Sequence, residues 1–332
     1  ADVIRIDLPG GGIDYGRLPM APAGRSIYWT SLNKGKRSFV VDFRRPEGKE
    51  LVRELVTRGD PKSNDGGVLL TNLGASWLSH ASLATQRPDL ISCTIEGNND
   101  GTTAVDYTVN CAVGFPLMTG SAGGTGGPIN HVLAAWDVAC AYQAAFGIAA
   151  ALSRRQALGK GAELRLALSD VAFSVLNHLG FSTEVEVLNQ ERTPIGNYLY
   201  GAFGKDFLSL DGHRLYVVAI SLNQWKGLVK ACGIDSAIDS LEARTGFDFR
   251  REGDRYEARE EIAATLEPWF SARPLGEIRA ALDTAGVCWG PYQSVRQALN
   301  FDPRLSSSNP IFDRVQTSGV GEHLAAGTSF RL

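Results

Sequence analysis

The stretch RSFVVDFRRPEGKELVRELV (residues 37–56) joins a strand pattern to a helix pattern, and it decides the fold class. Residues 37–43 form a short run of β-branched and aromatic side chains, which predicts a strand. Pro46 suits the first turn of a helix, and Leu51 and Leu55 recur at helical spacing. A helix that directly follows a strand is typical of a βαβ unit in a mostly parallel sheet.

The rest of the first half repeats this alternation. Residues 3–6, 66–72 and 89–95 predict further strands, so we expect an α/β, Rossmann-like, mostly parallel sheet domain over residues 1–185. From residue 196 the pattern changes to a hairpin with an Asp-Gly turn at Asp211, followed by amphipathic helices. This pattern predicts a smaller α+β domain over residues 196–287, with residues 288–332 returning to the large domain. Because the chain begins directly on a strand, we also expect that an N-terminal strand and helix are missing.

Composition excludes several classes of function. The 332 residues are 44% hydrophobic and 21% charged, with a formal net charge of −3. This charge gives no electrostatic reason to expect a nucleic-acid partner. No uninterrupted apolar run reaches about 18 residues, so we expect no membrane span. The widely spaced cysteines indicate no disulfide framework, so we expect a reducing, cytoplasmic setting. Two short basic patches, residues 33–38 and 42–49, suit a phosphorylated small molecule, although a solvated surface would have the same composition.

Common site motifs are absent from the sequence. The five cysteines are widely spaced, with no Cys-x-x-Cys pair or Cys/His spacing typical of zinc, so we expect no metal site. The glycine-rich loop at residues 119–128 matches neither the dinucleotide nor the P-loop fingerprint. No Gly-x-Ser-x-Gly elbow is present, which argues against a serine nucleophile.

An acidic residue stands out in an apolar segment. Residues 129–152, INHVLAAWDVACAYQAAFGIAAAL, predict a core helix that carries Asp137 near its start. A buried charge needs a partner or a chemical purpose, and a helix N-terminus stabilises negative charge. Position alone leaves two interpretations open: a structural helix cap, or a carboxylate nucleophile. His131, close to the glycine-rich loop, is a further candidate for lining a site.

Several segments together resemble one known family. SLNKGKRSFVVDFRRPEGK (residues 31–49), VDYTVNCAVGFPLMTG (residues 105–120) and the segment around Asp137 occur in the order seen in the class III, formyl-CoA-transferase-like coenzyme A transferases. In that family an aspartate at the start of the helix is the nucleophile. The resemblance therefore implies that Asp137 is catalytic, that the chain has the class III CoA-transferase fold, and that it forms an interlocked homodimer.

The resemblance also assigns binding residues, position by position. It implies that residues from three separate segments contact coenzyme A: Arg17, Val41, Arg44, Asn72 and Leu73. It places Asp106 as a second acidic residue near the nucleophile. The family's glycine-rich lid corresponds to GNYLYG, which makes Gly196, Asn197 and Tyr198 substrate-site candidates. The sequence departs from the family in this lid, which has fewer glycines, and at residues 71–77, where TNLGASW lacks the usual Pro-Gly pair.

The implied activity is CoA transfer, with a CoA thioester as substrate and no prosthetic group. The chain is most similar to a branch of the family that moves CoA between the two carboxyls of one C5 dicarboxylate. Related racemases place a histidine where this chain has Val105, which argues against racemisation. Two alternatives stay open: transfer between an acyl-CoA and a separate dicarboxylic acid, and an inactive CoA-binding protein.

Overall fold

The chain folds into two compact units. The computed structural model describes residues 2–58, 66–124 and 126–330. The first unit comprises residues 1–115, 130–191 and 303–332, and the second comprises residues 116–129 and 192–302. The predicted small-domain range, residues 196–287, lies inside the second unit. Residue 125 of the glycine-rich loop lies outside the described residues.

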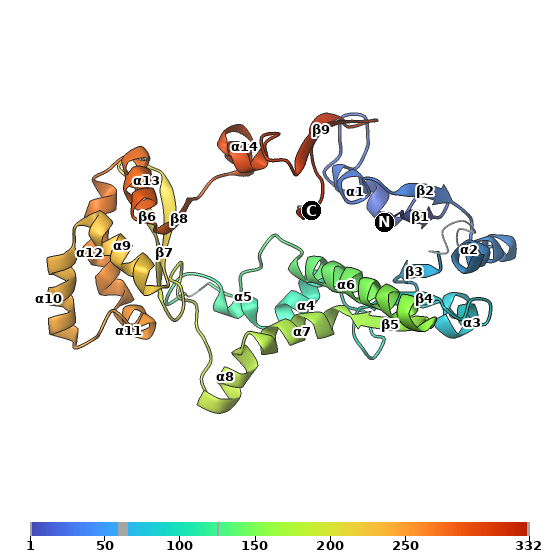
Figure 1. Cartoon of the computed structure of the whole chain (residues 1–332), viewed down its shortest axis with the longest axis horizontal. Helices are drawn as coiled ribbons and strands as arrows, with labels where there is room; N and C mark the ends of the chain where they lie inside the picture. Colours follow the sequence, from blue (N-terminus) through green and yellow to red (C-terminus); the bar gives the residue numbers. More distant parts are fainter. Residues whose placement is uncertain (1, 59–65, 125, 331–332) are drawn as a thin grey trace. The chain divides into compact units, whose positions relative to one another are not determined.

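The first unit contains two parallel sheets and a hairpin (Figure 1). Its strands are β1 (Ile4–Asp7), β2 (Arg37–Val40), β3 (Val68–Thr71), β4 (Ile91–Glu96), β5 (Ala162–Ala167), β9 (Phe312–Thr317) and β10 (Gly321–Ala326). β1 pairs with β2, and β3, β4 and β5 form a second sheet in that order, all in parallel. β9 and β10 are antiparallel. The predicted α/β alternation is confirmed.

The first unit also contains helices, two of which pack on the β3–β4–β5 sheet. They are α1 (Ile27–Leu32), α2 (Pro46–Arg58), α3 (His80–Ala84), α4 (Asp106–Ala112), α6 (Ala135–Leu158), α7 (Leu168–His178) and α8 (Phe181–Leu188), with short 3-10 turns η1 (Ile13–Gly16), η2 (Ser76–Leu78) and η3 (Pro303–Leu305). α6 packs on β4 and β5, and α7 packs on β5 and α6. α6 ends at Gly159, whose φ of 66° is the left-handed conformation that glycine adopts without strain.

Two predicted boundaries are wrong. The strand predicted over residues 37–43 ends at Val40, because the Phe43 amide bonds to the Val41 carbonyl in a tight turn. The helix predicted from residue 129 begins only at Ala135.

The prediction that α6 is a core helix holds for only one face. Trp136, Cys140 and Ala144 are buried, at intervals of four residues. A second stripe with the same spacing is exposed: Tyr142 is 74% and Phe146 75% accessible. α6 is also long and apolar enough to cross a membrane by length and composition, properties that core helices share.

The second unit is a three-stranded antiparallel sheet covered by helices. Its strands are β6 (Phe203–Leu208), β7 (Arg214–Ala219) and β8 (Cys288–Pro291), and its helices are α9 (Leu222–Cys232), α10 (Asp235–Thr245), α11 (Glu252–Glu257), α12 (Arg259–Ser271), α13 (Leu275–Thr284) and α14 (Val295–Phe301); α5 (Phe115–Met118) spans the boundary between the units. The strand order is β6–β7–β8. The hairpin turn predicted at Asp211 joins β6 to β7, and Gly212 has a φ of 79° there.

An arginine lies in the core of the second unit. The Arg255 side chain has no solvent exposure, and its guanidinium donates hydrogen bonds to the carbonyls of Phe249 and Ile220. It also lies 5.6 Å from the centroid of the Trp225 ring. Burial lowers the pKa of Arg255. This side chain therefore ties the end of β7 to the segment between α10 and α11.

Candidate active site

Asp137 lies in the first turn of α6 with an exposed side chain. Its backbone amide donates to Oδ2 of Asp106 over 3.0 Å. The amide of Trp136 donates to the same oxygen over 2.7 Å. The structure therefore places the predicted nucleophile and the predicted second acidic residue side by side.

The capping carboxylate explains where α6 begins. The first amides of a helix have no partner within the helix, and a side-chain oxygen usually accepts from them. Ala134, at the cap position, has no such oxygen. Asp106, the first residue of α4 and 3% exposed, supplies it from about thirty residues earlier in the chain. The helix starts at Ala135 because only from there are its first amides paired.

Sequence reasoning missed a second connection between α4 and α6. The indole Nε1 of Trp136 donates to Oδ1 of Asn110 over 3.2 Å. The amide nitrogen of Asn110, a fully buried residue, in turn donates to Oδ1 of Asn130 over 3.1 Å. The available signal was spacing: Asn110 follows Asp106 by four residues, so both lie on one face of a helix.

The surroundings make Asp137 a weaker acid than an ordinary aspartic acid. Burial by neighbouring groups raises its pKa most, the negative charge of Asp106 raises it further, and Arg17 lowers it. One turn along, burial and then the charge of Asp137 raise the pKa of the Cys140 thiol to about 11. A raised pKa favours a carboxylate that is basic and nucleophilic.

The basic residues predicted to bind coenzyme A have different environments. Arg17 is exposed just after η1, with its guanidinium 4.6 Å from the centroid of the Tyr28 ring. The guanidinium of exposed Arg44 instead makes two hydrogen bonds to Asp42, over 2.7 and 3.1 Å. The Asp42 carboxylate therefore occupies one edge of the Arg44 guanidinium. Val41 is half-buried and packs against the apolar core beneath α2.

Three further candidates lie in loops of the first unit. Asn72 and Leu73 are exposed directly after β3, and the Leu73 amide bonds to the Thr71 hydroxyl over 3.0 Å. Since β3 and β4 are adjacent and parallel, the loops after them leave the same edge of the sheet, where α/β proteins bind ligands. Asp106 follows β4, so it shares this edge. His131 is exposed in the loop ahead of α6.

The lid candidates line a cavity in the second unit. Its volume is about 480 Å³, and its polar walls come from the glycine-rich loop and the segment before β6. The lining residues are Met118, Thr119, Gly120, Ser121, Ile129, Ile195, Gly196, Asn197 and Tyr198. The Gly196 amide bonds to the Gly120 carbonyl over 2.8 Å, which joins the two segments. Lys205 Nζ lies 4.5 Å from the centroid of the Tyr198 ring.

A buried carboxylate supports this cavity. Asp206 pairs with Arg214, and it also accepts a hydrogen bond from Asn197. Burial raises the pKa of Asp206, but the hydrogen bonds from Arg214 and Asn197 outweigh it, so the pKa is below its usual range. The Asn197 side chain is thereby fixed at the cavity wall.

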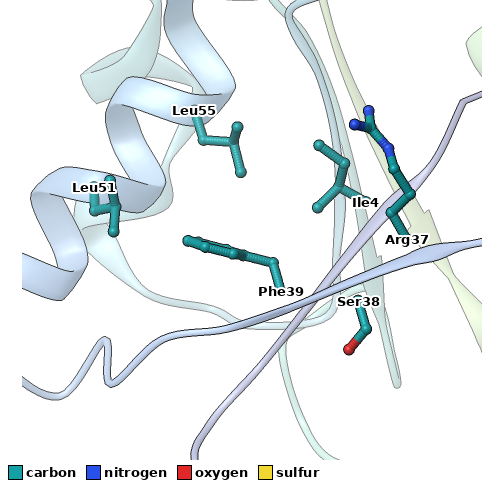
Figure 2. A pocket seen from close by; sticks show the side chains of 6 residues that line it. All are labelled: Ile4, Arg37, Ser38, Phe39, Leu51 and Leu55. Atoms are coloured by element: carbon teal, nitrogen blue, oxygen red, sulfur yellow. The ribbon is translucent and has the colours of Figure 1, made fainter.

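A smaller apolar pocket lies elsewhere in the first unit. It has a volume of about 230 Å³ between the β1–β2 sheet and α2. Figure 2 shows Leu55 on α2 and Phe39 and Ile4 on the strands pointing into it. None of the predicted site residues lines this pocket. Among the described residues, no cluster of three or more His, Cys, Asp or Glu could hold a metal ion.

Known proteins resemble this chain over its whole length. It is 45% identical over 330 residues to 2-methylfumaryl-CoA isomerase of Chloroflexus aurantiacus, covering 99% of this chain and 80% of that protein. It is 31% identical to formyl-CoA:oxalate CoA-transferase of Bradyrhizobium diazoefficiens, covering 100% and 81%. A crystal structure of a CAIB/BAIF family protein from Brucella suis superposes with a TM-score of 0.76 at 24% identity, covering 100% and 85%.

These similarities confirm the resemblance seen in the sequence. The Brucella suis structure shares the fold, in agreement with the predicted fold class. The model of the family described as CoA-transferase family III matches residues 1–332. This chain belongs to CoA-transferase family III.

Proposed function

We propose that this enzyme moves coenzyme A between the C1 and C4 carboxyls of mesaconate, converting 2-methylfumaryl-CoA into 3-methylfumaryl-CoA. The observation that carries the proposal is the 45% identity to 2-methylfumaryl-CoA isomerase over 99% of the chain. The chemistry is supported by Asp137, an exposed carboxylate with a raised pKa at the start of α6.

The first half of the reaction transfers CoA to the enzyme. The Asp137 carboxylate attacks the C1 carbonyl, the C–S bond breaks, and CoA thiolate leaves behind an acyl–aspartyl anhydride. The thiolate then attacks the aspartyl carbonyl and breaks the anhydride C–O bond. This step releases the C1 carboxylate and leaves an aspartyl-CoA thioester. No net proton is taken up or released.

The second half repeats these steps at the other carboxyl. The C4 carboxylate attacks the aspartyl thioester, which expels CoA thiolate and forms a new anhydride. The thiolate attacks the C4 carbonyl, so the C4 thioester forms and Asp137 is regenerated. Each step exchanges one activated acyl group for another, so catalysis depends on orientation and on exclusion of water.

We further propose the binding residues that the family resemblance implies. We assign the coenzyme A chain to Arg17, Val41, Arg44, Asn72 and Leu73 of the first unit. Asn72 and Leu73 lie at the carboxyl edge of the parallel sheet, and Arg44 contributes the guanidinium N–H groups that Asp42 does not occupy. CoA is the substrate here, and the proposed reaction needs no prosthetic group or metal.

We further propose that Gly196, Asn197, Tyr198 and His131 contact the substrate, as the family resemblance implies. Gly196, Asn197 and Tyr198 line the cavity of about 480 Å³ in the second unit, whose polar groups can hydrogen-bond a small acid. His131 is exposed in the first unit, ahead of α6.

An isotope experiment tests the route of transfer. The enzyme is incubated with 2-methylfumaryl-CoA and an excess of ¹³C-labelled mesaconate, and the products are analysed by mass spectrometry. The expected product is unlabelled 3-methylfumaryl-CoA, because the released acid stays bound. Label in the thioester would instead establish transfer to a separate acid, the chemistry named for the Bradyrhizobium relative. If no product forms, the result would favour the alternative that the chain binds CoA without transferring it.

We further propose that the enzyme is a cytoplasmic, interlocked homodimer that binds neither nucleic acid nor membrane. The exposed apolar stripe of α6, formed by Val138, Tyr142 and Phe146, supports a protein partner, since patches of this kind mark interfaces. The family resemblance makes a second copy of the chain the occupant.

The dimer is tested at this stripe. Phe146→Asp is expected to convert the dimer into monomer, because a charge would be buried without a partner in the interface. Light scattering after size exclusion measures the mass. Gln156→Asp, at an exposed polar position on the same helix, is the matched control and should leave the dimer intact. If the Phe146→Asp variant is still a dimer, this stripe is not part of the dimer interface.

A further inference from the structure

We propose that Asp106 is a positioning residue for the transfer: its buried carboxylate holds the first turn of α6 and thereby aims Asp137 at the acyl carbonyl. This inference rests on the proposed function, and it changes the role of Asp106 from substrate contact to control of the nucleophile.

The hydrogen bonds point directly at the nucleophile. A single oxygen, Oδ2 of Asp106, accepts from the amides of Trp136 and Asp137 over 2.7 and 3.0 Å. One of the two donors is therefore the backbone of the reacting residue itself. Because α6 has no side-chain cap of its own, these two bonds fix where its first turn starts and how Asp137 leaves the helix.

Asp106 cannot itself reach a substrate. It is 3% exposed, and its other oxygen, Oδ1, is buried without a hydrogen-bond partner among the described residues. Its burial leaves only the backbone amides of α6 as hydrogen-bond donors to Asp106 among the described residues. The carboxylate acts through the backbone of α6 and through its charge.

A second contact from α4 holds the same turn. The buried Asn110, also on α4, accepts from the Trp136 indole over 3.2 Å. The ring of Trp136 stacks on Phe115, with centroids 5.8 Å apart. The residue before the nucleophile is thus fixed at its amide and at its side chain. Only the carboxylate of Asp137 stays accessible, as a precisely aimed nucleophile requires.

The charge of Asp106 acts on the nucleophile as well. The positive end of a helix would favour ionised Asp137 and make it less basic. Asp106 neutralises this end and repels the second negative charge. The groups that face Asp137 are Asp106 from α4, Arg17 from the segment after η1, and the Cys140 thiol on α6 itself. Asp106 raises the pKa of Asp137, and Arg17 lowers it.

The test separates charge from capping. Asp106→Asn keeps an oxygen that accepts hydrogen bonds but removes the charge, whereas Asp106→Ala removes both. We expect kcat to fall about 10-fold in Asp106→Asn and about 100-fold in Asp106→Ala, because the first turn of α6 no longer holds the Asp137 carboxylate in position to attack. KM should stay within about twofold in both, since Asp106 does not touch the substrate. Asp235→Asn, at the exposed start of α10, is the control and should match wild type.

The pH dependence gives a readout that a purely structural role would not move. The acid limb of kcat/KM reports the ionisation of Asp137 in the free enzyme, so it should move to lower pH in Asp106→Asn. Carboxyl ¹³C NMR of aspartate-labelled protein, with the Asp137 signal assigned from Asp137→Asn, should show the same direction without any substrate. Thermal melts establish that each variant is folded.

The outcomes separate this inference from the proposed function. Folded Asp106→Ala with wild-type kcat, or an Asp137 titration unchanged in Asp106→Asn, would overturn the role of Asp106. If wild-type enzyme lacks CoA transfer but the NMR titration still shifts in Asp106→Asn, the proposed function fails while the link between the two carboxylates stands.

Discussion

Asp137→Asn is expected to abolish CoA transfer, with kcat reduced by about 10³-fold or more. The amide has nearly the shape of the carboxylate but cannot form the anhydride, so the covalent route is lost; each tenfold loss corresponds to about 1.4 kcal/mol of barrier. The rate of 3-methylfumaryl-CoA formation measures this, and Asp170→Asn, at the exposed start of α7, serves as the control. Turnover within tenfold of wild type would refute Asp137 as the nucleophile.

Loss of activity should come without loss of stability. The pKa of Asp137 is raised in the folded chain, mainly by burial, so its ionised form is less favourable there than in the unfolded chain. This penalty is present above the folded pKa and disappears as the pH falls below it. At neutral pH, Asp137→Asn removes the penalty, so its melting temperature should equal or exceed that of wild type. A lower melting temperature would mean that the substitution disturbs the start of α6.

The largest expected change in stability comes from Arg255→Ala. It removes two hydrogen bonds from a fully buried side chain and leaves two carbonyls and a cavity behind, which should cost about 3–5 kcal/mol of unfolding free energy. Urea unfolding measures the loss, and hydrogen exchange should place it in β7 and α11. Arg255→Met, which fills the space without a buried charge, should cost less.

A neighbouring arginine provides the control for this prediction. Arg251 is exposed and lies 4.0 Å from Asp254, so Arg251→Ala should cost no more than about 1 kcal/mol. Equal losses at Arg251 and Arg255 would show that the buried contacts of Arg255 contribute little.

The sequence predicted those features that local pattern controls. Strands and helices alternate as the hydrophobic spacing indicates, and the Asp-Gly turn at Asp211 forms the expected hairpin. The family resemblance is confirmed, and from the sequence alone it identifies Asp137 as the candidate nucleophile. These features depend on neighbours a few residues apart, or on motifs that keep their order.

Features that depend on distant partners could not be predicted. The start of α6 is set by Asp106, about thirty residues away, so the spacing of apolar residues placed it six residues too early. The exposed face of α6 could not be read from composition, because Phe146 is as apolar as any core residue. The hydrogen bonds from Arg44 to Asp42 likewise depend on the turn after β2, which the sequence pattern did not predict.

The shared cap of α6 has a consequence over the proposed catalytic cycle. In the resting enzyme two negative charges, those of Asp106 and Asp137, lie next to each other at the start of one helix. When Asp137 becomes an anhydride or a thioester it is neutral, and the repulsion is relieved. Asp137 regains its negative charge, and the repulsion returns, when the thiolate attacks the C4 carbonyl. In the proposed cycle, relief of this repulsion favours each acylation of Asp137.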